Sequence, residues 1–167
     1  MKKPEIEPLG FMNEQFRRYG CEDHEFAWRL KNTGIHAEYL ESAVAFHYED
    51  SNQEDPIAGF ERKCYTMTRY SLPLLATLAP EFLNESWMRF LQPVEGTDAW
   101  QLKLAKGFWR LAVNRFVASP LRSFLKWTDG VPWLYCPLLY RYVFAFAMLV
   151  GCDDQQKTDH GNEHSWL

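Results

Sequence analysis

The sequence predicts an α+β fold, in which a helix and two short strands are followed by a mostly α-helical extension. Three observations lead to this prediction. Residues 22–32 repeat apolar side chains at helical spacing, two apolar runs between residues 35 and 47 are typical of strands, and only helical periods appear beyond residue 84. With 167 residues, 47% of them hydrophobic, the chain is long enough for one domain with a core.

The first predicted helix runs from Glu22 to about Asn32. Residues 1–9 hold two prolines and alternating charges, typical of an extended connector, and a short apolar turn follows at 10–16. Within the helix, Phe26 and Leu30 repeat at i,i+4, and Glu25 can pair with Arg29 at the same spacing. Gly34 supplies a C-terminal stop.

Two short strands are expected next, at residues 35–40 and 43–47, joined by a polar turn. An acidic loop leads from there to Pro56, which suits the first turn of a helix. We expect that helix to extend to about Tyr70, with Pro73 and Pro80 breaking the pattern into short pieces.

The rest of the chain is predicted to be helical. Short and long helices are expected at 85–91, at 98–118 and from Ser119-Pro120 to about Trp127, and the long one carries an apolar stripe at Trp100, Leu104, Phe108 and Leu111. Residues 131–151 are the most apolar in the chain, but two prolines and Arg141 interrupt them. The uninterrupted part, 142–151, is too short to span a bilayer, which leaves a buried core helix or an interfacial one.

Charge is distributed unevenly along the chain. The net charge is -4, yet residues 100–150 hold seven cations and a single anion, Asp129. A basic, Trp-rich second half points to an anionic partner, and the aliphatic runs favour a membrane surface over nucleic acid. No C-x-x-C pair occurs among the four cysteines, and no apolar run follows Met1. A cytoplasmic location is therefore expected, with peripheral contact at the inner face of the cytoplasmic membrane.

Three ionisable residues between 19 and 47 attract attention as a candidate site. Glu22 and Asp23 stand where a helix begins, just after Gly20, and His47 closes the second predicted strand. Each has a structural explanation as well, because acidic side chains stabilise helix N-termini and a histidine at a strand end is commonly hydrogen-bonded. It is their combination with the surrounding sequence that favours a functional interpretation.

Four separated elements carry a family resemblance: Gly-Phe-Met-Asn-Glu-Gln-Phe at 10–16, Tyr-Gly-x-Glu-Asp-x-Glu-Phe-x-x-Arg-Leu at 19–30, Gly34, and Ala-x-Ala-Phe-His-x-Glu at 43–49. In order and spacing they resemble the C-terminal half of family 2 glycosyltransferases of the GT-A fold, in the branch of chondroitin-polymerase-like and galactosyltransferase-like enzymes. The resemblance covers about residues 8–66. It departs from the family at Asn13, where an Asp is usual.

The resemblance implies a role for each candidate residue. Asp23 matches the catalytic base, which takes a proton from the acceptor hydroxyl in an inverting transfer from a nucleotide-sugar donor. Glu22 matches the neighbour that binds acceptor hydroxyls, and His47 matches a ligand of the divalent cation, Mn or Mg, that neutralises the leaving diphosphate. Arg29 either forms an ion pair inside its helix or helps to position the acceptor loop.

One part of the family pattern is missing. The Asp-x-Asp motif of the nucleotide-binding half does not occur in this sequence. We therefore expect a partial GT-A segment at 1–66, a helical extension at 67–152 with a possible membrane contact, and a polar tail at 153–167. The expected function is the acceptor-side, catalytic-base segment of an inverting glycosyltransferase, inactive alone, acting on a glycan or lipid-linked acceptor. The alternative is a non-catalytic peripheral membrane-binding or scaffold protein derived from such a segment.

Overall fold

The protein is all-α in the part of the chain that its computed structural model describes, which is residues 9–35, 38, 40–45, 55–129, 131 and 134–159. No strand occurs within these ranges, so the predicted α+β class, with a GT-A segment of a helix and short strands, is wrong. The helical character expected for the second half extends to the whole described chain.

In the described part of the predicted strands, apolar side chains of both runs face solvent instead of packing on a core. Between them the chain turns, with Ala43 N donating a hydrogen bond to Leu40 O at 3.0 Å. Leu40 and Val44 are both exposed to solvent. Two short strands are marginal without a third strand or a helix to cover them, and local pattern alone cannot supply that cover. Residues 36, 37, 39, 46 and 47 of the predicted strands lie outside the described residues.

The described elements are α-helices joined by a π-helical turn, η2, and a 3-10 turn, η3. In chain order they are α2 (Glu22–Asn32), α3 (Pro56–Thr66), η2 (Met67–Ser71), α4 (Leu72–Leu78), α5 (Pro80–Glu85), η3 (Trp87–Phe90), α6 (Trp100–Ala112), α7 (Arg115–Thr128) and α8 (Pro137–Asp159).

Helix α2 has the predicted boundaries. Acidic residues occupy its first turn and basic residues its last turn, where each sign of charge stabilises the helix dipole. Gly34 follows the helix with a φ of 77°, the left-handed conformation that commonly ends a helix. Lys31 pairs with Glu85 at 3.1 Å, and the His24 ring contacts the edge of Phe82. These contacts attach α2 to α5.

The helix predicted from Pro56 continues much further than expected. After α3 the chain passes without a break through η2 into α4, and Pro73, the second residue of α4, directly follows the π turn. The wider π turn stands where α8 comes closest: a Cβ on Gly151 would lie 2.2 Å from Thr68 Oγ1 and 2.6 Å from Tyr65 O. Because α3 and η2 both pack on α8, they belong to the same helical assembly as the C-terminal half.

Two helices replace the long helix expected at 98–118. Helix α6 ends at Ala112, Val113 is extended, and the side chain of Asn114 caps α7 by accepting from Val117 N at 3.2 Å. Helix α7 therefore starts before Ser119-Pro120, and Pro120 lies inside it. The signal missed was an Asn at a capping position.

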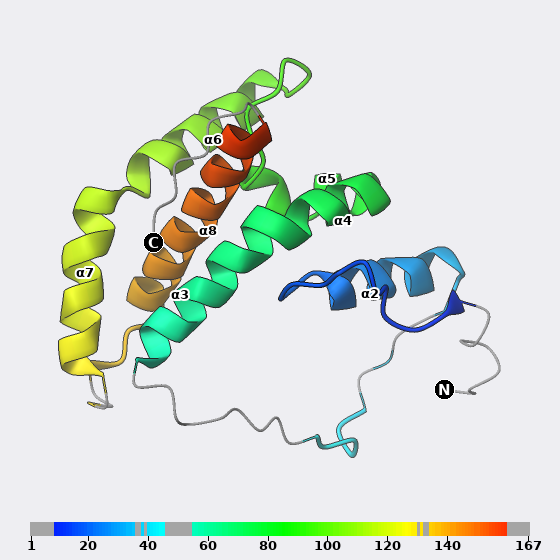
Figure 1. Cartoon of the computed structure of the whole chain (residues 1–167), viewed down its shortest axis with the longest axis horizontal. Helices are drawn as coiled ribbons and strands as arrows, with labels where there is room; N and C mark the ends of the chain where they lie inside the picture. Colours follow the sequence, from blue (N-terminus) through cyan, green and yellow to red (C-terminus); the bar gives the residue numbers. More distant parts are fainter. Residues whose placement is uncertain are drawn as a thin grey trace.

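Helix α8 is the centre of the fold, which answers the question left open for the apolar run at 131–151. It lies between α3 and α7 (Figure 1), and Ile57, Leu125 and Val143 from the three helices form one buried cluster. A second, larger cluster joins α4, α5, η3 and the far end of α8, and it includes Leu75, Leu83 and Leu149. Among the described helices, none has the length and apolar character needed to cross a membrane.

Candidate functional site

The backbone before α2 takes an unusual conformation that sets the position of the two adjacent carboxylates. Gly20 and Cys21 both have positive φ values, 96° and 73°. A Cβ on Gly20 would lie 2.7 Å from Met67 Cγ, so glycine is favoured here by space as well as by conformation. Ser71 Oγ donates a hydrogen bond to Tyr19 O at 3.0 Å, which ties this turn to η2.

Asp23 leaves this turn with its carboxylate in solvent. Its side chain is 68% exposed. Asp23 Oδ1 accepts hydrogen bonds from His24 N at 2.9 Å and lies 2.8 Å from His24 Nδ1, whereas no described side chain donates to Oδ2. One oxygen is thus held by the neighbouring residue and the other is open to an incoming hydroxyl.

Glu22 differs from Asp23 because it is half-buried. Its Oε2 atom is shielded from solvent and has no hydrogen-bond partner in the described part of the chain. Buried carboxylate oxygens are nearly always hydrogen-bonded in folded proteins. Glu25 Oε2 on the same helix is in the same state, and neither atom is open to a ligand, so only the exposed part of the Glu22 side chain adjoins Asp23 at the surface.

Arg29 makes both kinds of contact considered for it. Its Nε donates to Glu25 Oε1 at 2.7 Å, which is the predicted i,i+4 ion pair. The two terminal nitrogens reach back to the loop before α2, one to Leu9 O and the other to Phe11 O at 2.6 Å. Arg29 therefore holds residues 9–11 against the helix that carries Glu22 and Asp23.

His47 lies outside the described residues, so its relation to Asp23 stays a prediction. Across the part of the chain that is described, no group of three or more His, Cys, Asp or Glu side chains is arranged to hold a metal ion. The described residues therefore do not fit a complete divalent-cation site by themselves, and no chemical step is assigned to such an ion here.

Cysteine chemistry is disfavoured near this turn. Burial, together with the charges of Asp23 and Glu22, raises the pKa of the Cys21 thiol to about 12. The thiolate is the reactive form, so Cys21 is a packing residue.

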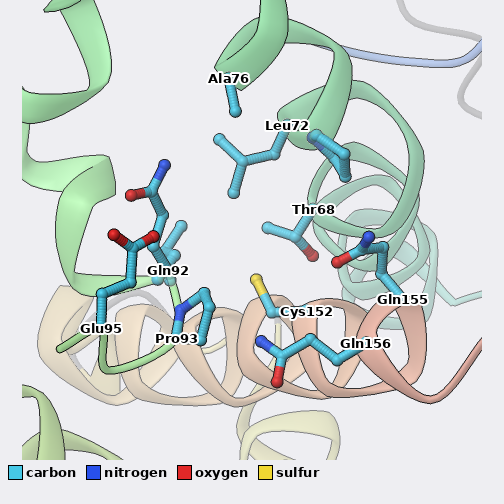
Figure 2. Close-up of a pocket in the computed structure, with 11 residues that line it drawn as sticks. Thr68, Leu72, Ala76, Gln92, Pro93, Glu95, Cys152, Gln155 and Gln156 are labelled. Carbon is cyan, nitrogen blue, oxygen red and sulfur yellow. The ribbon is translucent and has the colours of Figure 1, made fainter. Parts of the chain in front are cut away.

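A cavity of about 230 Å³ lies between η2, α4, the loop at 91–95 and the end of α8. Figure 2 shows Thr68, Gln92, Glu95, Cys152 and Gln156 around it. Burial raises the pKa of the Cys152 thiol to about 12, which makes it a poor nucleophile. No residue of α2 lines this cavity, so it is separate from the carboxylate pair.

A larger cavity, of about 410 Å³, has apolar walls. It lies between η3, α6 and α8, and its lining comprises Trp87, Phe90, Leu91, Ala105, Phe108, Trp109, Ala145 and Met148. No charged side chain takes part. Phe108 and Trp109 also reach solvent, so the cavity opens beside the outer surface of α6.

Many of the basic side chains of the second half are used inside the fold. Four of the seven cations at 100–150 form ion pairs with carboxylates from outside that stretch: Lys106 with Asp98, Arg110 with Asp153, Arg122 with Glu61, and Lys126 with Asp55. The uneven charge along the sequence is therefore largely balanced in three dimensions. The sequence alone does not reveal this balance, because three of the four partners, Asp153, Glu61 and Asp55, are far from their cations along the chain.

Comparison of the chain with protein-family models, with curated proteins and with solved structures finds no match. The function is accordingly argued from the residues themselves.

Proposed function

We propose that this chain supplies the acceptor side and the catalytic base of an inverting glycosyltransferase, and that Asp23 is the base. The observation that carries the proposal is the pair at the start of α2. An exposed carboxylate with one open oxygen stands next to a half-buried carboxylate that lacks a hydrogen-bond donor. The sequence resemblance at 8–66 supports the same assignment.

In this reaction the main task of the protein is to place the acceptor hydroxyl next to Asp23. An acceptor hydroxyl oxygen forms a bond to C1 of the donor sugar, the bond from C1 to the diphosphate breaks, and the hydroxyl proton passes to Asp23 Oδ2. A carboxylate suits this step because it is ionised at neutral pH and must accept a proton only as the new bond forms. His24, bonded to Oδ1, keeps the group from rotating away.

Glu22 and Arg29 have supporting roles in this proposal. Glu22, as the resemblance implies, accepts a hydrogen bond from a second hydroxyl of the acceptor, which orients the first toward Asp23; its shielded Oε2 atom is not the oxygen that makes this contact. Arg29 positions the loop at 9–11 beside the same turn through its contacts with two backbone carbonyls. The donor, the Mn or Mg ion expected with it, and the glycan or lipid-linked acceptor are parts of the proposal that belong to the complete enzyme.

The test is the variant Asp23→Asn, which keeps the size of the side chain and removes its basicity. In the complete enzyme, assayed by release of nucleoside diphosphate from labelled nucleotide sugars, we expect transfer to fall by about 10²-fold or more. Binding of the donor should be unchanged. Glu14→Gln is the matched control, since Glu14 is an exposed carboxylate in the preceding loop.

Transfer at the wild-type rate by Asp23→Asn would contradict the proposal. It would favour the non-catalytic alternative, a membrane-binding or scaffold protein, for which neither substitution matters. Glu22→Gln separates binding from catalysis, because it should lower the affinity for the acceptor more than it lowers the rate of transfer in the bound complex.

A further inference from the structure

Helix α6 turns its apolar stripe to solvent. Trp100, Leu104, Phe108 and Leu111 follow one another at i, i+4, i+8 and i+11, and each is between 64% and 76% exposed. The same helix buries Lys106, whose ammonium donates to Pro93 O at 2.9 Å and pairs with Asp98 at 2.7 Å. The usual arrangement of an amphipathic helix on a core is therefore reversed.

Helix α7 repeats the pattern. Its inner side packs on α8 through Ala118 and Leu125, while Phe116 and Trp127 are 92% and 78% exposed and Phe124 is 42% exposed. Leu111 is the last exposed apolar residue of α6 and Phe116 the first of α7. Helix α6 leads into α7 at an angle, and α7 runs beside α8 (Figure 1). Together the seven residues Trp100, Leu104, Phe108, Leu111, Phe116, Phe124 and Trp127 make up what we call the α6–α7 face.

Cations outnumber anions around this face, although four of them pair with carboxylates from outside it and Asp129 is exposed two residues after Trp127. Residues 100–128 contain six cations and no carboxylate. Arg115, at the bend between the helices, is exposed and has no partner among the described residues. Arg122 and Lys126 pair with acids on α3 and before it, yet their side chains remain 40% and 43% exposed. An apolar stripe flanked by cations is the pattern of helices that lie in the plane of a membrane interface.

We propose that the α6–α7 face binds the surface of an anionic lipid bilayer, with its aromatic rings at the boundary between headgroups and acyl chains. Trp and Phe rings favour that depth, and Arg115 lies where it meets a headgroup phosphate. A second copy of the chain is the competing occupant, and it would be seen as a dimer in sizing experiments.

The apolar cavity behind α6 is consistent with this occupant. Phe108 belongs both to the α6–α7 face and to the cavity wall, and Trp109 stands beside it. An acyl chain that bends away from the bilayer has an uncharged space of about 410 Å³ to enter.

The experiment is sedimentation of the full chain with vesicles of phosphatidylcholine alone and of phosphatidylcholine mixed with phosphatidylglycerol. We expect binding to the mixed vesicles, and a loss of about tenfold for each of Phe116→Ser and Trp127→Ser, because each removes a large apolar side chain from the lipid contact. Arg115→Gln should reduce the preference for the anionic vesicles by about fivefold. Phe11→Ser is the matched control, since Phe11 is 69% exposed outside the α6–α7 face.

Three results would overturn the proposal: no binding of the wild-type chain to either vesicle, equal binding by wild type and the two α7 variants, or a dimer in sizing experiments that those variants abolish. Circular dichroism confirms that the variants fold. The proposal does not depend on the transferase assignment, because Phe116, Trp127 and Arg115 all lie outside α2 and the loop that Arg29 holds.

Discussion

At the level of single residues, burial separates the cysteines of this chain into two kinds. The pKa of Cys64 is raised to about 11, and those of Cys21 and Cys152 to about 12, in each case chiefly by burial. Cys136 is partly exposed at the start of α8. All four are free thiols, as their wide spacing in the sequence indicated.

Alkylation should therefore be selective. With iodoacetamide at neutral pH, we expect the folded protein to be modified at Cys136 alone, because the thiols of the other three are both buried and protonated. Unfolded in denaturant, the chain should react at all four positions. Peptide mapping by mass spectrometry reads out the sites. Rapid labelling of Cys21 in the folded protein would show that the turn before α2 opens in solution.

The candidate site was predictable where it depends on neighbours in sequence. The boundaries of α2, the Glu25–Arg29 pair and the stop at Gly34 all follow from spacing. The reach of Arg29 to Leu9 O and Phe11 O depends on how the preceding loop folds back, and the unpartnered Glu22 Oε2 depends on what the tertiary structure places around it. Neither leaves a local signal in the sequence.

At the level of elements, one side chain, that of Asp55, makes two stabilising interactions at the start of α3. Asp55 accepts a hydrogen bond from Ala58 N at 2.9 Å as the N-cap, and it also pairs with Lys126 of α7. The hydrogen bond from Lys126 lowers the pKa of Asp55, and the bond from Ala58 N lowers it further. Asp55 thus joins the cap of one helix to the side of another.

This arrangement predicts a pH dependence of stability. A carboxyl whose pKa is lowered by folding contributes stability that is complete above its unfolded pKa, about 3.9, and is lost as pH falls through the lower folded value. Asp55→Asn keeps a capping side chain but removes the charge, so its free energy of unfolding should fall less than that of the wild type below about pH 4. Asp55→Ala should cost about 1 kcal/mol even at neutral pH. Urea titrations across this pH range measure both effects, and identical acid slopes for wild type and Asp55→Asn would contradict the prediction.

The periodicity of apolar residues predicted where helices occur better than it predicted what each side of a helix packs against. The apolar stripe of α6 was evident in the sequence, but periodicity reveals only that one side of a helix is apolar. Whether that side faces a core or the solvent depends on the other helices. In α6 the side that carries Lys106 faces the interior, where Lys106 pairs with Asp98, so the apolar side faces solvent. The break between α6 and α7 was missed for a local reason, the cap at Asn114.

At the level of the whole molecule, the fold depends on how closely α8 approaches η2. Gly151 is the contact point, since any side chain there would meet Thr68 Oγ1 and Tyr65 O. The sequence predicted a helical second half but not that the described residues between 9 and 66 share its all-α character. Short apolar runs are ambiguous between helix, strand and loop until the partner that covers them is known.

Two glycine substitutions should therefore have opposite effects. Gly151→Ala should lower the free energy of unfolding by about 1–3 kcal/mol, because the added methyl group forces α8 and η2 apart. Gly107→Ala in α6 has nothing within 4 Å of the new methyl group, and should raise it by about 0.5–1 kcal/mol through helix propensity. Thermal or urea unfolding compares the two variants with the wild type. A stabilising Gly151→Ala would mean that the two elements are further apart than described.

The ion pairs that join early and late helices have a consequence for synthesis on the ribosome. Helix α3 is translated well before α7 and α8. Its contacts form only later, because the ion-pair partners of Asp55 and Glu61 and the residues that bury Ile57 lie on those later helices. Folding of the bundle is thus completed only after most of the chain has left the exit tunnel. A nascent chain paused before residue 115 displays the uncovered side of α3, and at that stage it is a substrate for chaperones.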